Sequence, residues 1–127
     1  MTQIRITTGI DVIEIERIGA ALERWGDRFL HRIYTDAEVV HCRGRAESLA
    51  GRFGAKEAVS KALGVGVRHL RWRDIEILAD RRGKPTVRLH GRAAEVAVHQ
   101  CLTGFDISIT HSRSDAAVVV VAWGDEG

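Results

Sequence analysis

The sequence predicts an α+β fold, formed by a single domain over residues 1–127. Apolar and polar residues alternate strictly over 106–110, and a nearly continuous apolar run follows at 116–123, so two strands should pair across the turn between them. Residues 47–63 are rich in Ala, Leu and small residues and stop at Gly64, which predicts the longest helix. At 127 residues with 45% hydrophobic content, the chain can bury one sizeable core.

The N-terminal part predicts a strand followed by helices. Isoleucines and Val between 4 and 13 favour an extended segment. Apolar residues over 15–25 recur at helical spacing, so an amphipathic helix should end near Gly26. The four residues from Thr35 form a capping box, which predicts a short helix beginning at about Asp36.

After the long helix the pattern returns to strands. Residues 65–67 should form a loop, and residues 74–79 a strand. The Asp, Gly and Pro of 80–85 favour a turn, with 86–89 as the hairpin partner. A helix is expected over 93–102, before the final pair of strands.

Composition excludes several functional classes. The net charge of +2 is too small to indicate a nucleic-acid partner. No apolar run of about 20 residues predicts a membrane span, and no secretory signal pattern is present at the N-terminus, so a cytoplasmic location is expected. Cys42 and Cys101 lack metal-ligand spacing and should be reduced thiols. Core packing is the expected role of the three tryptophans, Trp25, Trp72 and Trp123.

Charged residues within the long helix are the first candidates for chemistry. Glu57 and Lys61 are four residues apart and share a helix face, which small residues such as Gly54 leave open. Arg52 and Lys56 add two cations nearby. The alternative is an ordinary surface ion pair, worth about 0.3–0.5 kcal/mol.

Asp11 is a single carboxylate within the apolar N-terminal run. If it lies beside Glu57 in the fold, two hard carboxylates with open positions would suit Mg²⁺, which commonly keeps water and phosphate ligands. Zinc is disfavoured, because no His or Cys cluster accompanies either acid. The alternative is a helix N-cap or a loop carboxylate.

Two further features have both a functional and a structural interpretation. His111 and Ser112 follow a predicted strand, where functional side chains often lie, although a lone His is more often not catalytic. The second feature is a set of arginines at helical spacing, Arg17, Arg24, Arg28 and Arg32. If one unbroken helix carried all four, they would form a basic stripe that could bind an acidic partner. A break in the helix near Gly26 would instead leave an ordinary solvated face.

Four segments together resemble one protein family in their order and spacing: Gly9–Ile18, Arg52–Leu63, Gly83–Pro85 and Ile107–Ser112. The chain is similar to the small 4'-phosphopantetheinyl transferases of the holo-[acyl-carrier-protein] synthase type, and the resemblance covers nearly its whole length. It implies an antiparallel or mixed sheet with a long central helix and flanking helices. It also implies transfer of 4'-phosphopantetheine from coenzyme A to a serine of an apo acyl carrier protein, releasing adenosine 3',5'-bisphosphate.

The resemblance assigns roles to the residues already singled out. Asp11 and Glu57 would bind Mg²⁺, with Mn²⁺ as a possible substitute, and Lys61 would stabilise charge on the leaving phosphate. The serine proton would pass to Glu57 directly or through metal-bound water, the latter being favoured because a metal lowers the basicity of its ligand.

Binding residues also follow from the resemblance. Expected coenzyme A contacts are Arg52, Lys56, Ser60, Gly64, Lys84, Pro85, His111 and Ser112. Expected contacts to the acidic carrier protein are Arg17, Arg24 and Arg28, with Phe29 as an apolar anchor.

A homotrimer with active sites at subunit interfaces is also implied, with Ile107–Ile109 and Val118–Val121 facing its axis. Two positions depart from the family pattern. Gly54 replaces a more usual Ala, and Asp80–Arg82 stands in place of a shorter turn.

Two other functions remain open from the sequence. One is a non-catalytic coenzyme A or nucleotide-binding module of the same fold, and the other is a scaffold whose arginines bind an acidic partner. The carrier protein could serve fatty-acid, polyketide or peptide synthesis.

Overall fold

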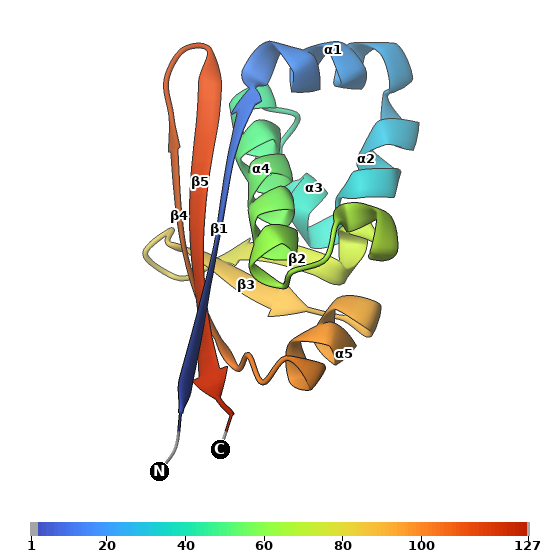
Figure 1. Cartoon of the computed structure of the whole chain (residues 1–127). Helices are drawn as coiled ribbons and strands as arrows, with labels where there is room; N and C mark the ends of the chain where they lie inside the picture. Colours follow the sequence, from blue (N-terminus) through green and yellow to red (C-terminus); the bar gives the residue numbers. More distant parts are fainter. Residues whose placement is uncertain (1–2, 127) are drawn as a thin grey trace.

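A computed structural model describes residues 3–126 and has two sheets packed around one long helix (Figure 1). Its strands are β1 (Ile4–Glu14), β2 (Ile75–Ala79), β3 (Pro85–Leu89), β4 (Gly104–His111) and β5 (Asp115–Asp125). Its helices are α1 (Ile15–Trp25), α2 (Asp27–Ile33), α3 (Asp36–Cys42), α4 (Ala46–Ala62) and α5 (Gly91–His99), with short 3₁₀ turns η1 (Val67–His69) and η2 (Trp72–Asp74). The α+β prediction is confirmed, and the start of β1 pairs with the end of β5, so these two ends lie together at one end of the molecule (Figure 1).

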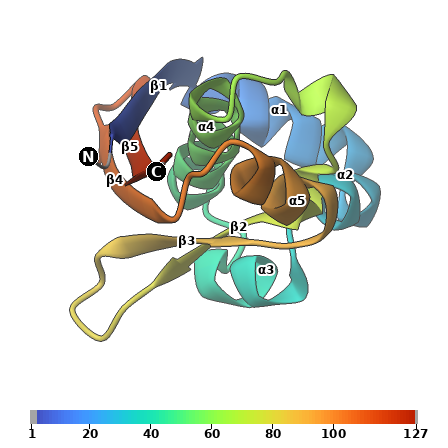
Figure 2. The same cartoon turned by 60° about the horizontal axis from the view of Figure 1, so that its bottom comes forward.

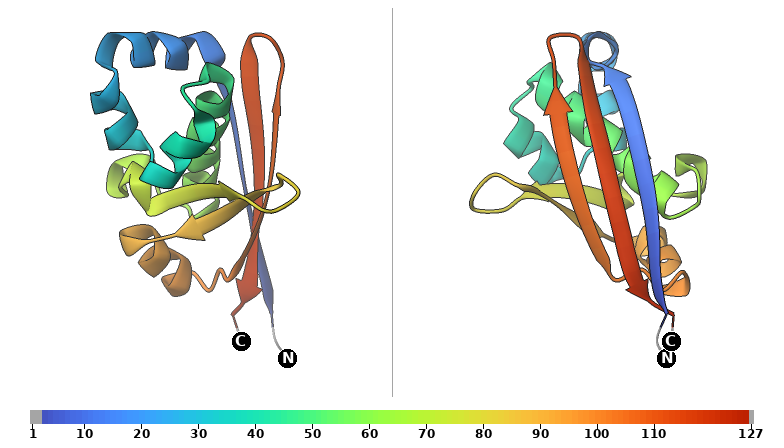
Figure 3. Two further views of the ribbon diagram at one scale, coloured as in Figure 1. Left: turned by 180° about the vertical axis from the view of Figure 1, so that it is seen from behind. Right: turned by 60° about the vertical axis from the view of Figure 1, so that its left-hand side comes forward.

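The larger sheet has three antiparallel strands with β5 in the centre, as the right-hand view of Figure 3 shows. The β4 strand pairs with β5 across the turn at 112–114, so the predicted hairpin is confirmed. On β5 the buried residues Val118 and Val120 alternate with the exposed Val119 and Val121, because successive side chains point to opposite faces. The smaller sheet is the predicted hairpin of β2 and β3.

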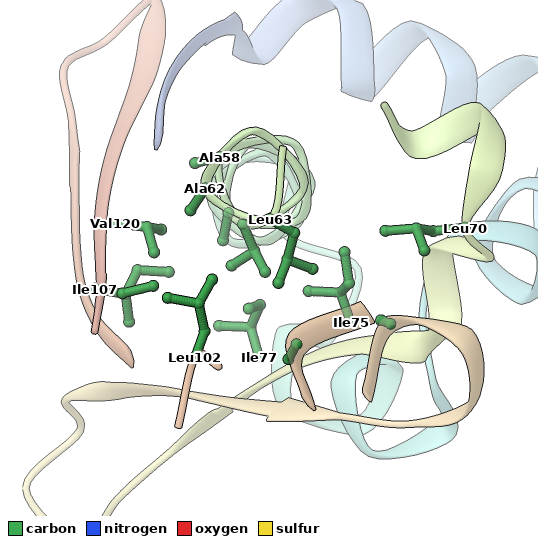
Figure 4. Packing of buried hydrophobic residues seen from close by; sticks show 14 of the residues in the cluster. Ala58, Ala62, Leu63, Leu70, Ile75, Ile77, Leu102, Ile107 and Val120 are labelled. Carbon is green, nitrogen blue, oxygen red and sulfur yellow. The ribbon is translucent and has the colours of Figure 1, made fainter. Parts of the chain in front are cut away.

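Helix α4 packs directly on the larger sheet. A Cβ atom at Gly9 of β1 would lie 1.8 Å from the carbonyl oxygen of Ala58, so only glycine lets the strand backbone touch the helix. Alanines of α4 and the buried face of β5 then form the main core with side chains from β2 and β4 (Figure 4). This close contact holds β1 in a fixed position beside α4.

Gly26 separates α1 from α2. Its φ of 52° lies in a region that favours glycine, and the chain changes direction there (Figure 1). The arginines at 17 and 24 therefore belong to one helix, and those at 28 and 32 to another. The basic stripe does not run along one unbroken helix.

The tryptophan prediction is wrong for two of the three residues. Trp25 is 50% exposed and Trp123 42% exposed, whereas Trp72 stacks on Phe53 with 4.7 Å between ring centroids. Trp123 occupies an outward position of β5, where the strand alternation directs it away from the core. Among the helices of residues 3–126, none is long and apolar enough to cross a membrane.

Candidate active site

Asp11, Glu57 and Lys61 come together where β1 crosses α4. The Lys61 ammonium donates to the carbonyl oxygen of Ile10 at 2.9 Å and lies 3.4 Å from Asp11 Oδ1. Glu57 precedes Lys61 by one helical turn, on the same face of α4. These contacts bring together the residues that the sequence suggested, so Asp11 is neither a helix N-cap nor a loop carboxylate.

Gly54 makes room for the aspartate. A Cβ atom at position 54 would lie 3.5 Å from Asp11 Oδ2 and 3.1 Å from a methyl group of Val118. Alanine at this position would require Val118 to shift by a few tenths of an ångström. The glycine that departs from the family pattern thus lies directly under the acidic side chain.

The electrostatics of the site favour a cation. Burial and the neighbouring Asp11 carboxylate raise the pKa of Glu57, while Lys61 and Arg17 oppose that shift. Residues 3–126 contain no cluster of three or more His, Cys, Asp or Glu side chains suited to a metal. Two half-buried carboxylates fit Mg²⁺, which completes its coordination with water and phosphate oxygens.

Lys56 does not belong to this site. Its side chain is fully buried and donates to Glu38 Oε1 at 2.8 Å, to the carbonyl oxygen of Trp72 at 3.1 Å and to that of Ile75. The expected coenzyme A contact is therefore wrong, because one residue along a helix is a rotation of about 100° and turns Lys56 into the core. Burial lowers the pKa of Lys56, and the Glu38 carboxylate opposes the shift.

Ser60 and Gly64 have backbone roles. Ser60 is buried, and its hydroxyl donates to the carbonyl oxygen of Glu57 at 2.7 Å, so it is not available to a ligand in this conformation. Gly64 is exposed with a φ of 75°, which ends α4. Its exposure leaves a backbone contact to coenzyme A open as a prediction.

Arg52 is nine-tenths buried yet incompletely paired. Among the described residues its Nε finds no hydrogen-bond partner. Its charge, together with burial and the nearby Arg45 and Arg43, lowers the pKa of His41. A buried guanidinium with an unpaired donor is suited to an anion, so an Arg52 contact to a coenzyme A phosphate stays a prediction.

Lys84 and His111 lie at the other edge of the larger sheet. Lys84 lies 2.9 Å from Asp106 Oδ1 at the β4 edge, and His111 is exposed at the end of β4. In the sheet register β5 separates His111 from β1, the strand that carries Asp11. One chain therefore does not bring these residues beside the carboxylates.

The neighbours of these two residues differ in exposure. Pro85 is half-buried at the start of β3. Ser112 is exposed in the β4–β5 turn, and its Oγ accepts hydrogen bonds from the backbone N–H groups of Ser114 and Asp115. Neither residue contacts the carboxylate pair, so their roles as coenzyme A contacts stay predictions.

The expected carrier-protein contacts are exposed, with one exception. Arg17 and Arg24 of α1 and Arg28 of α2 are exposed, and Arg24 lies 4.9 Å over the Trp25 ring. Phe29 is half-buried and packs edge-to-face on Tyr34, with 5.9 Å between ring centroids. It contributes chiefly to the core under α2, so its proposed role as an apolar anchor has little support in the structure.

The structure also shows what the sequence concealed. Glu38 belongs to the predicted capping box, which is present, but its full burial and its pairing with Lys56 were not foreseen. No local pattern distinguishes a buried capping glutamate from an exposed one. Lys56 directly precedes Glu57, about 100° away around the helix and among small and apolar residues, and this was the available signal that a buried acid must exist.

Comparisons with known proteins identify the family of this chain. The family model of the 4'-phosphopantetheinyl transferase superfamily matches residues 7–120. A holo-[acyl-carrier-protein] synthase of Herpetosiphon aurantiacus is 44% identical over 126 residues, covering 94% of this chain and 99% of the relative.

Solved structures show the same fold. The Helicobacter pylori holo-[acyl-carrier-protein] synthase in complex with coenzyme A superposes with a TM-score of 0.83 at 34% identity, covering 91% of this chain and 98% of the other. The Bacillus anthracis enzyme in complex with CoA (3',5'-ADP) gives 0.76 at 34% identity, covering 96% and 99%. The predicted family fold is thus confirmed, and the chain belongs to the 4'-phosphopantetheinyl transferase superfamily.

Proposed function

We propose that this chain transfers the 4'-phosphopantetheine group of coenzyme A to a serine of an apo acyl carrier protein. The observation that carries the proposal is the meeting of Asp11, Glu57 and Lys61 in a chain whose relatives are holo-[acyl-carrier-protein] synthases. A non-catalytic coenzyme A-binding module would not need this cluster. We place the reaction in the cytoplasm, and leave open which biosynthetic carrier protein is served.

The residues of the site divide the chemical work. The serine oxygen bonds to the phosphorus that carries pantetheine, and the bond from that phosphorus to the bridging oxygen of adenosine 3',5'-bisphosphate breaks. Asp11 and Glu57 would hold Mg²⁺ or Mn²⁺, which supplies Lewis-acid activation of the phosphoryl group. Of the three N–H donors of Lys61, one is directed to Ile10 and one to Asp11, which leaves one for the leaving phosphate. The serine proton would pass to Glu57 directly or through a metal-bound water, and burial and the Asp11 carboxylate raise the pKa of Glu57.

Product analysis tests the reaction. Chromatography of a mixture of this protein, coenzyme A, Mg²⁺ and apo acyl carrier protein should show adenosine 3',5'-bisphosphate only when the carrier is present. Release that does not depend on the carrier serine would contradict the transfer.

Metal binding can be tested without turnover. Mg²⁺ should raise the melting temperature of the wild type, because a ligand at about 100 times its Kd stabilises the folded state by about 2.7 kcal/mol. Asp11→Asn should abolish this rise, while the matched control Glu14→Gln, an exposed carboxylate on the same strand, should keep it. Calorimetry of the wild type and of each variant, with and without Mg²⁺, measures these changes in melting temperature. An equal rise in Asp11→Asn would remove Asp11 from the metal site.

We further propose a homotrimer with active sites between subunits. The outward face of β1 and β5 carries seven exposed apolar side chains, which are Ile4, Ile6, Ile10, Val12, Val119, Val121 and Trp123, each 37–74% exposed. Such an exposed surface favours burial against another chain. In such a trimer, Lys84 and His111 at the β4 edge of one subunit could lie beside the carboxylate pair, Asp11 and Glu57, of a neighbouring subunit.

The residues expected at the trimer axis need a correction. Ile107, Val118 and Val120 are at most 2% exposed and belong to the core of their own chain. Because strand side chains alternate, the outward residues of β5 are Val119 and Val121 instead. The proposed interface therefore consists of these residues and their neighbours on β1.

Charge on this face should disrupt the assembly. Val119→Glu is expected to convert a species of three times 14.1 kDa into one of 14.1 kDa in light scattering. The control Val98→Glu, at a 78% exposed apolar position on α5, should leave the mass unchanged. A wild type that runs as a monomer would refute the trimer.

A further inference from the structure

Five arginines surround a surface groove away from the carboxylate pair. Two adjoining pockets of about 540 and 380 Å³ share Arg68, Leu70, Arg71 and Asp74 as lining residues. The remaining arginines at the groove are Arg32, Arg73 and Arg92. The groove lies along η1 and η2, between the end of α2 and the start of α5.

Most of this positive charge has no internal partner. Arg73 lies 3.6 Å from Asp36 and Arg92 lies 3.5 Å from Glu95. No carboxylate of residues 3–126 lies within 4.0 Å of the side-chain nitrogens of the three other arginines, which are Arg32, Arg68 and Arg71.

Among residues 3–126, Asp74 is the one acidic residue that lines these two pockets, and it does not neutralise the arginines. Asp74 directs its carboxylate to the start of α5, where a Cβ atom at Gly91 would lie 2.9 Å from Asp74 Oδ2. The carboxylate therefore faces the positive end of a helix rather than the arginines. The groove keeps a net positive field.

The groove adjoins the surface proposed to bind the carrier protein. Arg32 is one helical turn after Arg28 on α2, so the two lie on the same helix face. The η2 turn packs against α2, and in Figure 2 the segment after α4 lies beside α2. The arginines of α1 and α2 and those of the groove thus form adjacent positive areas.

The exposure of these arginines indicates the kind of partner. All three unpaired side chains are exposed on a flexible stem, without the buried donors that would hold one phosphate in a fixed geometry. Exposed charges of this kind steer association with a surface of opposite sign and give contacts that salt weakens. A protein surface with several carboxylates fits this arrangement better than a small phosphate ligand.

We propose that this groove is a second docking surface for the acidic face of the apo acyl carrier protein, beyond the arginines of α1 and early α2. The inference rests on the proposed transferase function, because that function supplies the acidic partner. It assigns the arginines of η1 and η2 to carrier binding and gives them no part in the binding of coenzyme A.

A charge-reversal pair tests the groove. In Arg68→Glu/Arg71→Glu, the Kd for a fluorescently labelled apo acyl carrier protein should rise about tenfold at low salt, and the difference should shrink at high salt. The matched control Arg81→Glu/Arg88→Glu makes an equal change of net charge at two exposed arginines on the β2–β3 hairpin. The Kd of the control should stay within about twofold of the wild type, and the KM for coenzyme A should be unchanged in the groove variant.

Three results would overturn the inference: an unchanged carrier Kd in the groove variant, an equal rise in the control, or a higher KM for coenzyme A instead. Anisotropy measures carrier binding without turnover. A wild type that binds the carrier but transfers nothing would therefore contradict the proposed function and leave the docking surface standing.

Discussion

Glu57→Gln and Asp11→Asn are each expected to lower kcat by at least about a hundredfold, because loss of about 3 kcal/mol of transition-state stabilisation has that effect. Both substitutions keep the size of the side chain and remove a charge from a half-buried pair. The neutral amide that Glu57→Gln introduces would also relieve the repulsion from Asp11, so the fold should be preserved or slightly stabilised. Transfer rates at saturating coenzyme A and carrier protein measure the effect.

A matched control separates the loss of the site from a general change of charge. Glu14→Gln removes an exposed carboxylate from the same strand as Asp11 and should retain wild-type kcat. Circular dichroism should show equal folding for all three variants. Near-normal turnover in either Glu57→Gln or Asp11→Asn would refute the assignment of the carboxylate pair.

Lys56→Met is expected to destabilise the fold by about 3–5 kcal/mol, because it leaves the buried Glu38 charge without its cation. Glu38 also accepts hydrogen bonds from the backbone N–H groups of Thr35 and Ile77, at 2.8 and 3.0 Å. One ion pair thus joins α3, α4 and β2. Urea unfolding followed by circular dichroism measures the loss.

The double substitution Glu38→Leu/Lys56→Met sharpens this test. Replacing both charges with apolar groups often removes much of the penalty of breaking a buried pair. Recovery should be partial here, because the N–H groups of Thr35 and Ile77 still lose their acceptor. A single Lys56→Met variant as stable as the wild type would show that the pair contributes nothing to the fold.

Most of the fold could be predicted because its signals are local. The capping box at Thr35, the alternation in β4 and the glycine after α4 each fix an element through near neighbours in sequence. The break at Gly26 could be anticipated only as an alternative, since glycine permits a positive φ without requiring it.

The errors concern the direction in which a side chain points. The sequence groups Asp11 with Glu57 and Lys61, and the structure places the three together, whereas the predicted coenzyme A contact of Lys56 fails because its ammonium lies in the core. The partner that makes its burial possible is 18 residues away, and such a pairing leaves no periodic signal. The direction of side chains in β5 could not be predicted either, because in a nearly continuous apolar run both sets of alternating residues are apolar.

The intact mass of an apo acyl carrier protein, measured after incubation with this protein, coenzyme A and Mg²⁺, reports the proposed transfer itself. We expect the carrier to gain the mass of one phosphopantetheine group, and we expect no gain when EDTA removes the metal or when Glu57→Gln replaces the wild type. An unchanged mass with fatty-acid, polyketide and peptidyl carriers, despite coenzyme A binding, would contradict the transfer. It would instead favour a non-catalytic coenzyme A-binding module of the same fold.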